Sequence, residues 1–387
     1  MSCREKAYVL LLLAAAAWLH SSAASSTTIV PGSPEGSLIP APWQTQTPAL
    51  TPPSRGLIVT ATQLAVVVNT ADPLSVAIGD YYVHQRHILE GNVITVRFDP
   101  QRDELPEAEF TKLRANVESR VGTRVQAYAL TWARPYRVGC MSITAAFAFG
   151  IDPKYCASGC KPTQSSPYFD AETARPHDDL HIRPAISIAA LNFARAKALI
   201  DRGVKSDGAM PRGTAYLVLT DDSARNVRAV EYDRLGALER QRVKIDILQD
   251  KDVHDRSDVM FYFIGVATVP ALLSNRFLPG AIADHLTSFG GMLTTDTGQM
   301  SSLRWLEAGA TGSYGTVVEP CNILGKFPNI GVLMKHYLAG ETLIEAYWKS
   351  VIMPGQGLFI GEPLAAPYRQ TAAPGLNPSG APPGRPK

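Results

Sequence analysis

Side chains capable of acid–base or nucleophilic chemistry gather in two short segments of the C-terminal third of the chain. The first segment places Asp284, His285 and Ser288 directly after a short apolar run, and the second ends at Glu319 and Cys321 after a glycine-rich stretch. In open α/β sheets, ligands bind and catalysis occurs just beyond the carboxyl ends of the strands. We therefore expect the two segments to meet at one surface cleft.

His285 and Cys321 are the residue types that a cysteine hydrolase uses. Imidazole changes charge near neutral pH, so His285 could act as a general base, and a base beside Cys321 would generate a thiolate nucleophile. The structural alternative is a His285 that hydrogen-bonds a neighbouring loop. Ser313 is another nucleophile candidate, but the Gly-x-Ser-x-Gly elbow is not matched. The glycines around Ser313 instead favour a strand that brings two backbones close together.

The cysteines are informative because the chain carries a secretory-type leader. Beyond Cys3 in that leader, four cysteines remain, at Cys140, Cys156, Cys160 and Cys321. An even number in an oxidising compartment favours disulfides. Cys156 and Cys160 flank Ala-Ser-Gly and could form a local bridge, although Cys140 competes for either one. If Cys321 were free, a second cysteine would also be free or would pair between chains, so the count favours a disulfide-bonded or buried Cys321.

One loop resembles a metal site in its composition. His177, Asp179 and His181 are residue types that ligate zinc or calcium, and zinc could also use the three cysteines at 140–160. Pro176 and Pro184 frame the histidines as a solvated loop, and export favours disulfides over zinc. We therefore expect no metal and no cofactor.

The N-terminal residues predict export. Residues 1–24 combine a positively charged start, an apolar run and a small-residue cleavage region, the pattern of a signal peptide; an uncleaved anchor is the alternative. No later stretch offers ~18 uncharged apolar residues, so we expect no membrane span in the mature chain. The net charge is +2 without clustered Lys and Arg, which argues against nucleic-acid binding. The expected location is exported, in the periplasm or outside a bacterial cell.

The remaining chain is predicted to have one folded domain. Residues 25–54 are a Ser/Thr/Pro-rich disordered lead-in and residues 370–387 a Pro/Gly-rich disordered tail. Residues 55–369 form the α/β domain, with a cysteine-containing, loop-rich insertion at 133–185. Continuously apolar strands separated by helices indicate a mostly parallel sheet flanked by helices. Strands are expected at 64–69, 94–98, 125–131, 215–220, 243–248, 259–265 and 281–283, and helices at 107–119, 192–202, 224–240, 301–308 and 330–350, the last broken near Gly340.

Several strings carry a family resemblance. LAVVVNTADPLSVAIGDYYVHQRHI, GAIADHLTSFGG, GATGSYGTVVEPCN and GLFIGEPLAAPY resemble a family of uncharacterised exported bacterial proteins, over nearly all of residues 57–368. More remotely, the C-terminal third is similar to gingipain-type cysteine peptidases, which have a caspase-like fold. The resemblance implies a caspase-like, gingipain-like three-layer sandwich.

The same resemblance bears on catalysis. In gingipain-type peptidases a late strand runs into Gly-His-Gly, the next strand ends at the nucleophilic Cys, and a Gly-Asp-Pro turn comes near the end. Here Val266 stands where the catalytic His would be, and the next strand runs into Asp284 and His285 with no Cys, while 361–363 reads Gly-Glu-Pro. The resemblance therefore implies that the usual peptidase dyad is absent. A shifted register, with His285 and Cys321, would restore one.

Two functions follow from these observations. In the first, the chain is an exported caspase-like domain that lacks the usual dyad and binds an unknown ligand or protein partner at the strand ends. The expected cleft residues are Asp284, Ser288, Ser313 and Glu319, together with Asn69, which ends a strand of its own. In the second, the chain is a cysteine peptidase or related hydrolase that uses His285 and Cys321.

Overall fold

The computed structural model describes residues 58–157, 159–240 and 243–370. The predicted leader, the lead-in and residues 371–387 of the predicted tail lie outside these ranges. Within the described ranges, no helix has both the length and the apolar character needed to cross a bilayer.

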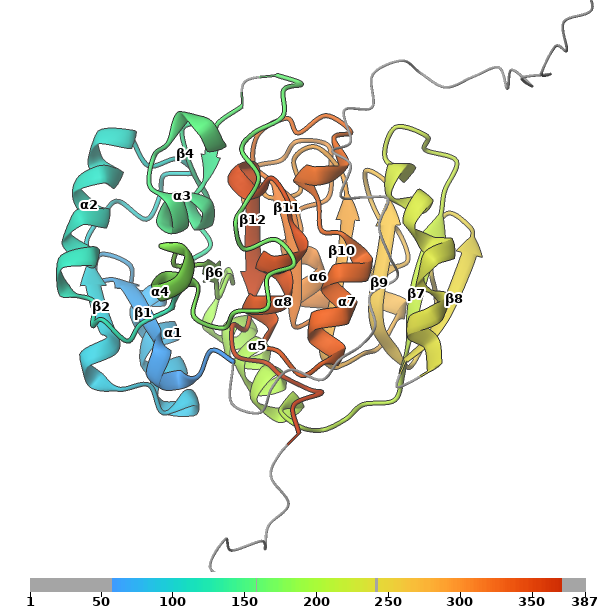
Figure 1. Cartoon of the computed structure of the whole chain (residues 1–387), viewed down its shortest axis with the longest axis horizontal. Helices are drawn as coiled ribbons and strands as arrows, with labels where there is room; N and C mark the ends of the chain where they lie inside the picture. Colours follow the sequence, from blue (N-terminus) through green and yellow to red (C-terminus); the bar gives the residue numbers. More distant parts are fainter. Residues whose placement is uncertain (1–57, 158, 241–242, 371–387) are drawn as a thin grey trace, which may run out of the picture. The chain divides into compact units, whose positions relative to one another are not determined.

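A ten-stranded sheet organises the described chain (Figure 1), in the order β2-β1-β3-β6-β12-β11-β10-β9-β7-β8. Parallel pairing predominates, and β12 runs antiparallel to β11. The mostly parallel sheet predicted from the sequence is confirmed. The strands are β1 (Leu64–Asn69), β2 (Val93–Val96), β3 (Ala127–Leu130), β6 (Ala185–Ser187), β7 (Gly213–Leu219), β8 (Val243–Gln249), β9 (Val259–Gly265), β10 (Phe277–Leu286), β11 (Gly312–Thr316) and β12 (Gly357–Gly361).

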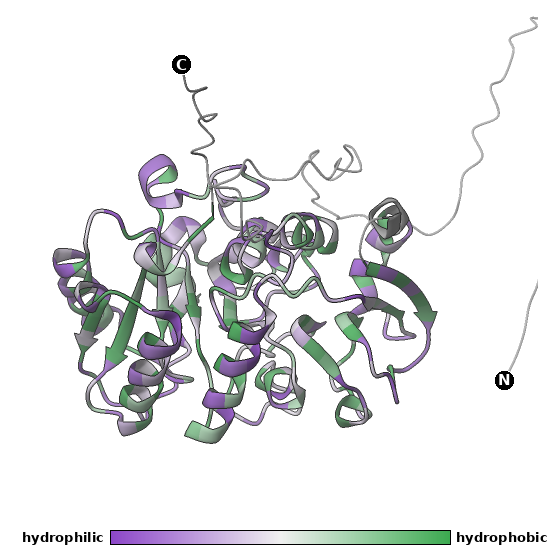
Figure 2. Cartoon of the chain, turned by 90° about the horizontal axis from the view of Figure 1, so that it is seen from below, coloured by the Kyte–Doolittle hydropathy of each residue, from purple (hydrophilic) through white to green (hydrophobic). Residues whose placement is uncertain are grey.

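Helices flank both faces of the sheet, and Figure 2 shows mainly apolar strands between helices that carry both hydrophilic and hydrophobic residues. On one face Arg202 of α5 donates hydrogen bonds to the carbonyls of Leu306 in α6 and Ala310. On the other face Tyr337 of α7 donates to the carbonyl of Gly280 in β10. The helices are α1 (Pro73–Arg86), α2 (Glu107–Arg120), α3 (Ile143–Phe149), α4 (Pro176–Leu180), α5 (Phe193–Ser206), α6 (Leu303–Ala308), α7 (Ile330–Leu338), α8 (Leu343–Ser350) and the 3₁₀ helices η5 (Asn226–Arg240), η6 (Leu272–Ser274) and η7 (Leu324–Lys326).

Local sequence signals account for several helix boundaries. Asp72 caps α1 by accepting a hydrogen bond from the Leu74 amide, and Pro73 takes the first helical position, where its missing N–H costs nothing. Gly340 has a φ of 101°, a conformation open to glycine, and it separates α7 from α8. The helix expected at 224–240 is instead the 3₁₀ helix η5.

The segment 133–185, which was expected to be loop-rich, contains several regular elements. It holds the hairpin β4 (Arg137–Val138) and β5 (Met141–Ser142), the helices α3 and α4, and the start of β6. Six of the seven α3 residues are buried. The α3 sequence ITAAFAF is apolar on all sides, so it shows no helical period in the sequence.

Loops that follow strands in the two halves of the sheet meet at one edge. Thr294 and Thr295, which follow β10, donate hydrogen bonds of 2.7 and 2.6 Å to the carboxylate of Asp103, which follows β2. This carboxyl edge is where an α/β sheet places its binding sites.

Candidate functional site

His285 is buried at the end of β10. Its Nδ1 accepts a 2.9 Å hydrogen bond from the indole N–H of Trp305, so the proton lies on Nε2, which donates to the carbonyl of Met300 at 2.9 Å. Burial lowers the pKa of His285 to about 4. The imidazole is therefore neutral at neutral pH, and its lone pair is already engaged.

Asp284 points to the opposite face of β10, because successive side chains alternate along a strand. Its Oδ1 forms a 2.7 Å ion pair with Nη2 of Arg228 from η5, and both side chains are buried. Burial raises the pKa of Asp284, and the neighbouring Arg228 opposes that rise. Oδ2 of Asp284 and both Nε and Nη1 of Arg228 have no hydrogen-bond partner among the described residues.

All four described cysteines are in disulfides. Cys140 pairs with Cys156, and Cys160 pairs with Cys321, with Cα–Cα distances of 5.5 and 5.4 Å that suit a disulfide. The local bridge between Cys156 and Cys160 is therefore wrong. The loop carrying Cys160 crosses to the segment after β11, so its spatial neighbour is 161 positions away in sequence. A disulfide sulfur is not a thiolate, so Cys321 has no nucleophilic thiol in this structure.

A pocket of about 340 Å³ opens where β10 and β11 end. Ser288 and Glu319, two of the predicted cleft residues, line it beside the Cys160–Cys321 disulfide. Asp284 lies deeper than this lining, on the same side of β10 as the pocket residue Leu286. The lining residues are Cys160, Ala224, Arg225, Leu286, Thr287, Ser288, Glu319, Cys321, Asn322 and Phe327.

Hydrogen bonds fix the polar part of the pocket wall. Nε of Arg225 donates to Oγ1 of Thr287 at 3.1 Å, and its Nη1 forms a 2.8 Å ion pair with Asp222. Oε1 of Glu319 accepts from the backbone N–H of Cys321 at 2.7 Å. The ammonium of Lys326, next to the lining residue Phe327, is buried, which lowers its pKa to about 8. The wall therefore carries charges of both signs in fixed positions.

Two predicted cleft residues lie apart from this pocket. Ser313 is fully buried in β11, and its hydroxyl has no hydrogen-bond partner within the part of the chain that the structure describes. Asn69 is also buried, and its side chain joins the end of β1 to the loop after β2 through both backbone groups of Phe98. Asn69 thus stabilises the carboxyl edge of the first strands.

Residues 177–180 were expected in a solvated loop, but they belong to the short helix α4, and two of the three predicted metal ligands are held by contacts with protein side chains. Nε2 of His177 is 2.7 Å from Nη2 of Arg183, and Thr173 hydrogen-bonds the carboxylate of Asp179. His181 is exposed and caps α4 in the left-handed conformation. Within the described ranges, no group of three or more His, Cys, Asp or Glu side chains could hold a metal ion.

Four residues in or near the site do not stand out in the sequence: Arg225, Arg228, Lys326 and Phe327. Arg228 lies in the apolar run NVRAV, and an isolated charge in such a run was the one available signal. Arg225 lies in a turn, Lys326 ends the 3₁₀ helix η7 and Phe327 follows it, and none of them belongs to a recognisable chemical motif.

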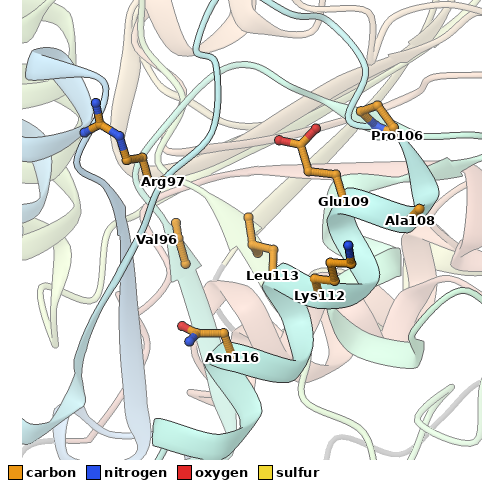
Figure 3. Close-up of a pocket in the computed structure, with 8 residues that line it drawn as sticks. All are labelled: Val96, Arg97, Pro106, Ala108, Glu109, Lys112, Leu113 and Asn116. Atoms are coloured by element: carbon orange, nitrogen blue, oxygen red, sulfur yellow. The ribbon is translucent and has the colours of Figure 1, made fainter.

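A larger groove of about 530 Å³ lies between the end of β2 and α2 (Figure 3). Glu109 and Leu113 project into it from α2, and Arg97 and Val96 come from the end of β2. The groove lies at the outermost strand of the sheet, away from the junctions between strands where α/β sheets bind ligands.

No family model, curated protein or solved structure matches this chain.

Proposed function

We propose that this chain is an exported, disulfide-stabilised binding protein with a caspase-like fold and no peptidase activity. It binds a small ligand in the pocket beside Ser288 and Glu319. The observation that carries this proposal is the Cys160–Cys321 disulfide, because it occupies the sulfur that a cysteine peptidase would need. Two disulfides are also compatible with an oxidising compartment outside the cytosol.

The surroundings of His285 support the same function. A general base needs a free lone pair directed at the proton it removes. In His285 that lone pair accepts the N–H of Trp305, and the other ring nitrogen donates to Met300. Both hydrogen bonds would have to break before His285 could take a proton from substrate.

The strand arrangement supports the caspase-like part of the proposal. β9 and β10 are parallel neighbours, and His285 pairs in register with Ile264, the residue before the end of β9. The positions that gingipain-type peptidases use for catalysis therefore adjoin at the carboxyl edge. The position that corresponds to the catalytic His of those peptidases is Val266 here, an apolar residue that packs against the smaller core cluster of the protein.

The pocket lining indicates the kind of ligand. Leu286, Phe327 and Ala224 provide apolar contacts, and Arg225 and Glu319 are the charged groups. A pocket of about 340 Å³ falls at the small end of the range typical of small-molecule sites. The ligand that fits has an apolar body and at least one polar or charged group.

Peptide mapping under non-reducing conditions, with free thiols alkylated beforehand, tests the absence of peptidase activity. We expect a peptide that joins Cys160 to Cys321 and no alkylated Cys321. Recovery of alkylated Cys321, together with peptide hydrolysis that the C321A substitution abolishes, would refute the proposal and establish the peptidase.

Binding is tested with anilinonaphthalene sulfonate, a fluorescent probe with an apolar body and one anionic group. We expect saturable fluorescence that the Ser288→Trp substitution removes, because the indole fills the pocket. Ser119→Trp on the exposed surface of α2 is the matched control and should bind as the wild type does. Equal binding by both variants would show that the probe does not occupy this pocket.

A further inference from the structure

A second pocket lies at the carboxyl edge of the first strands and shares no lining residue with the pocket beside Glu319. Its volume is about 180 Å³, and the segments that follow β1, β2, β3 and β6 line it together with Thr294. Asp72 caps α1 through one carboxylate oxygen, and the function proposed above involves none of the residues that line this second pocket.

The position of this pocket in the sheet is typical of a ligand site. β1 pairs with β2 on one side and with β3 on the other, so the chain leaves β1 in one direction and later continues in the other. That reversal is the topological switch point, and ligands of α/β sheets bind in the crevice at its carboxyl end.

Two groups of opposite charge face this pocket without bonding each other. Oδ1 of Asp72 accepts from the Leu74 amide at 3.0 Å, and Nη2 of Arg134 donates to Oε1 of Gln101 at 3.0 Å. Among the described residues, Oδ2 of Asp72 and both Nε and Nη1 of Arg134 have no hydrogen-bond partner, and no ion pair joins Asp72 to Arg134. The nearby carboxylate of Asp103 accepts hydrogen bonds from Thr294 and Thr295, and although burial raises its pKa, these bonds together with the charge of Arg134 lower the pKa overall.

Apolar side chains complete the wall between these charges. Trp132 is 2% exposed, and Leu191 is 47% exposed at the surface. Leu74, in the first turn of α1, adds a third apolar contact. The pocket therefore offers an anion, a cation and an apolar surface within the space of roughly six liquid water molecules.

We propose that this pocket binds a small zwitterion of the α-amino acid type. The ammonium group of the ligand faces Asp72, its carboxylate faces Arg134, and its side chain packs on Trp132 and Leu191. An α-amino acid carries both charges on one carbon, so it can present both of them to the two unbonded groups of opposite charge that line a pocket of about 180 Å³.

Isothermal titration of the mature full-length protein with the standard L-amino acids tests this proposal. We expect saturable binding of at least one with an apolar side chain, such as L-leucine. Its N-acetyl derivative lacks the ammonium charge and its amide lacks the carboxylate. Each derivative should bind at least about tenfold more weakly, because a hydrogen bond to a charged group contributes that much or more.

Two substitutions place the binding in this pocket. Asp72→Asn removes the charge but keeps the helix cap, because Asn caps helices as well as Asp does, and Arg134→Gln removes the cation. Both should weaken amino acid binding at least about tenfold, with an unchanged circular dichroism spectrum. Arg97→Gln, which removes the same charge in the groove of Figure 3, should bind as the wild type does.

The proposal is overturned if no amino acid binds, if the N-acetyl and amide derivatives bind as tightly as the free amino acid, or if D72N and R134Q retain wild-type affinity. These outcomes are independent of the pocket beside Glu319, whose test uses a different probe and different variants.

Discussion

Removing the Cys160–Cys321 disulfide should destabilise the protein more than removing Cys140–Cys156. In the chain-entropy model, a disulfide stabilises by closing a loop in the unfolded chain, and the effect grows with the logarithm of loop length. The sequence separations are 161 and 16 residues. The model gives about 5 kcal/mol for the longer loop and about 3 kcal/mol for the shorter one, a difference of about 2 kcal/mol.

The two loops do not overlap in sequence, so each double variant changes one loop without altering the other. The assay is equilibrium urea unfolding of C160A/C321A and C140A/C156A, each compared with the wild type at one temperature. Replacing both cysteines of a pair leaves no unpaired thiol. Equal losses, or a larger loss for C140A/C156A, would refute the reasoning from loop length and would show that contacts around the shorter disulfide dominate.

Three further predictions concern buried groups. His285→Gln should lower the free energy of unfolding by about 2–3 kcal/mol at neutral pH, because Trp305 and Met300 lose their hydrogen bonds. Burial holds the pKa of His285 at about 4, below its unfolded value of about 6.5. The free energy of unfolding of the wild type should therefore fall as pH drops from about 6.5 towards 4. An equally steep fall in His285→Gln would contradict this. Burial lowers the pKa of His336, but hydrogen bonds from its ring to Asp170 and Glu341 raise it overall. The stability that His336 contributes should therefore be present below about pH 6.5 and lost as pH rises through its folded pKa. In parallel denaturation curves, His336→Gln should lower the free energy of unfolding more at pH 6 than at pH 9. A larger loss at pH 9 would exclude the ring hydrogen bonds as the cause. Finally, Gly265→Ala should destabilise the protein by about 1–3 kcal/mol, because the added Cβ would lie 2.1 Å from the backbone carbonyl oxygen of Arg225. A melting temperature equal to that of the wild type would show that the two backbones move apart without a loss of stability.

Local chemistry explains which parts of the fold the sequence predicted well. The bounds of β1 and β9 match the predicted ranges, because continuously apolar, β-branched runs identify strands buried on both faces. The break at Gly340 was predicted because it depends on one residue type at one position, and the cap at Asp72 follows from the same kind of local chemistry.

The strand β10 shows where such prediction stops. Residues 281–283 were predicted as the strand, but it runs from Phe277 to Leu286. Pro279 and Gly280 resemble a turn at its start, and Asp284 and His285 resemble a loop at its end. Both polar residues are buried because Arg228 and Trp305, distant in sequence, provide partners. Periodicity cannot reveal partners supplied by another segment.

The candidate site depends on the same kind of long-range information. Ser288 and Glu319 were placed at strand ends from the sequence, and the structure brings them to one pocket. The pairing of Cys160 with Cys321 could not be deduced, since four cysteines allow three connectivities. Proximity in the sequence favoured a disulfide between Cys156 and Cys160. The loop that carries Cys160 instead lies beside the segment after β11, which places Cys160 next to Cys321.

The reversal of β12 has a practical consequence for measuring binding. Because β12 runs antiparallel to β11, the chain after it returns to the edge where β7 and β10 begin. There the hydroxyl of Tyr368 donates to the carbonyl of Pro211, just ahead of β7. Both pockets open at the other edge. A sensor surface that captures the protein through an affinity tag added after Arg369 would therefore bind it at the edge opposite the pockets. Both pocket openings would then face the flowing analyte.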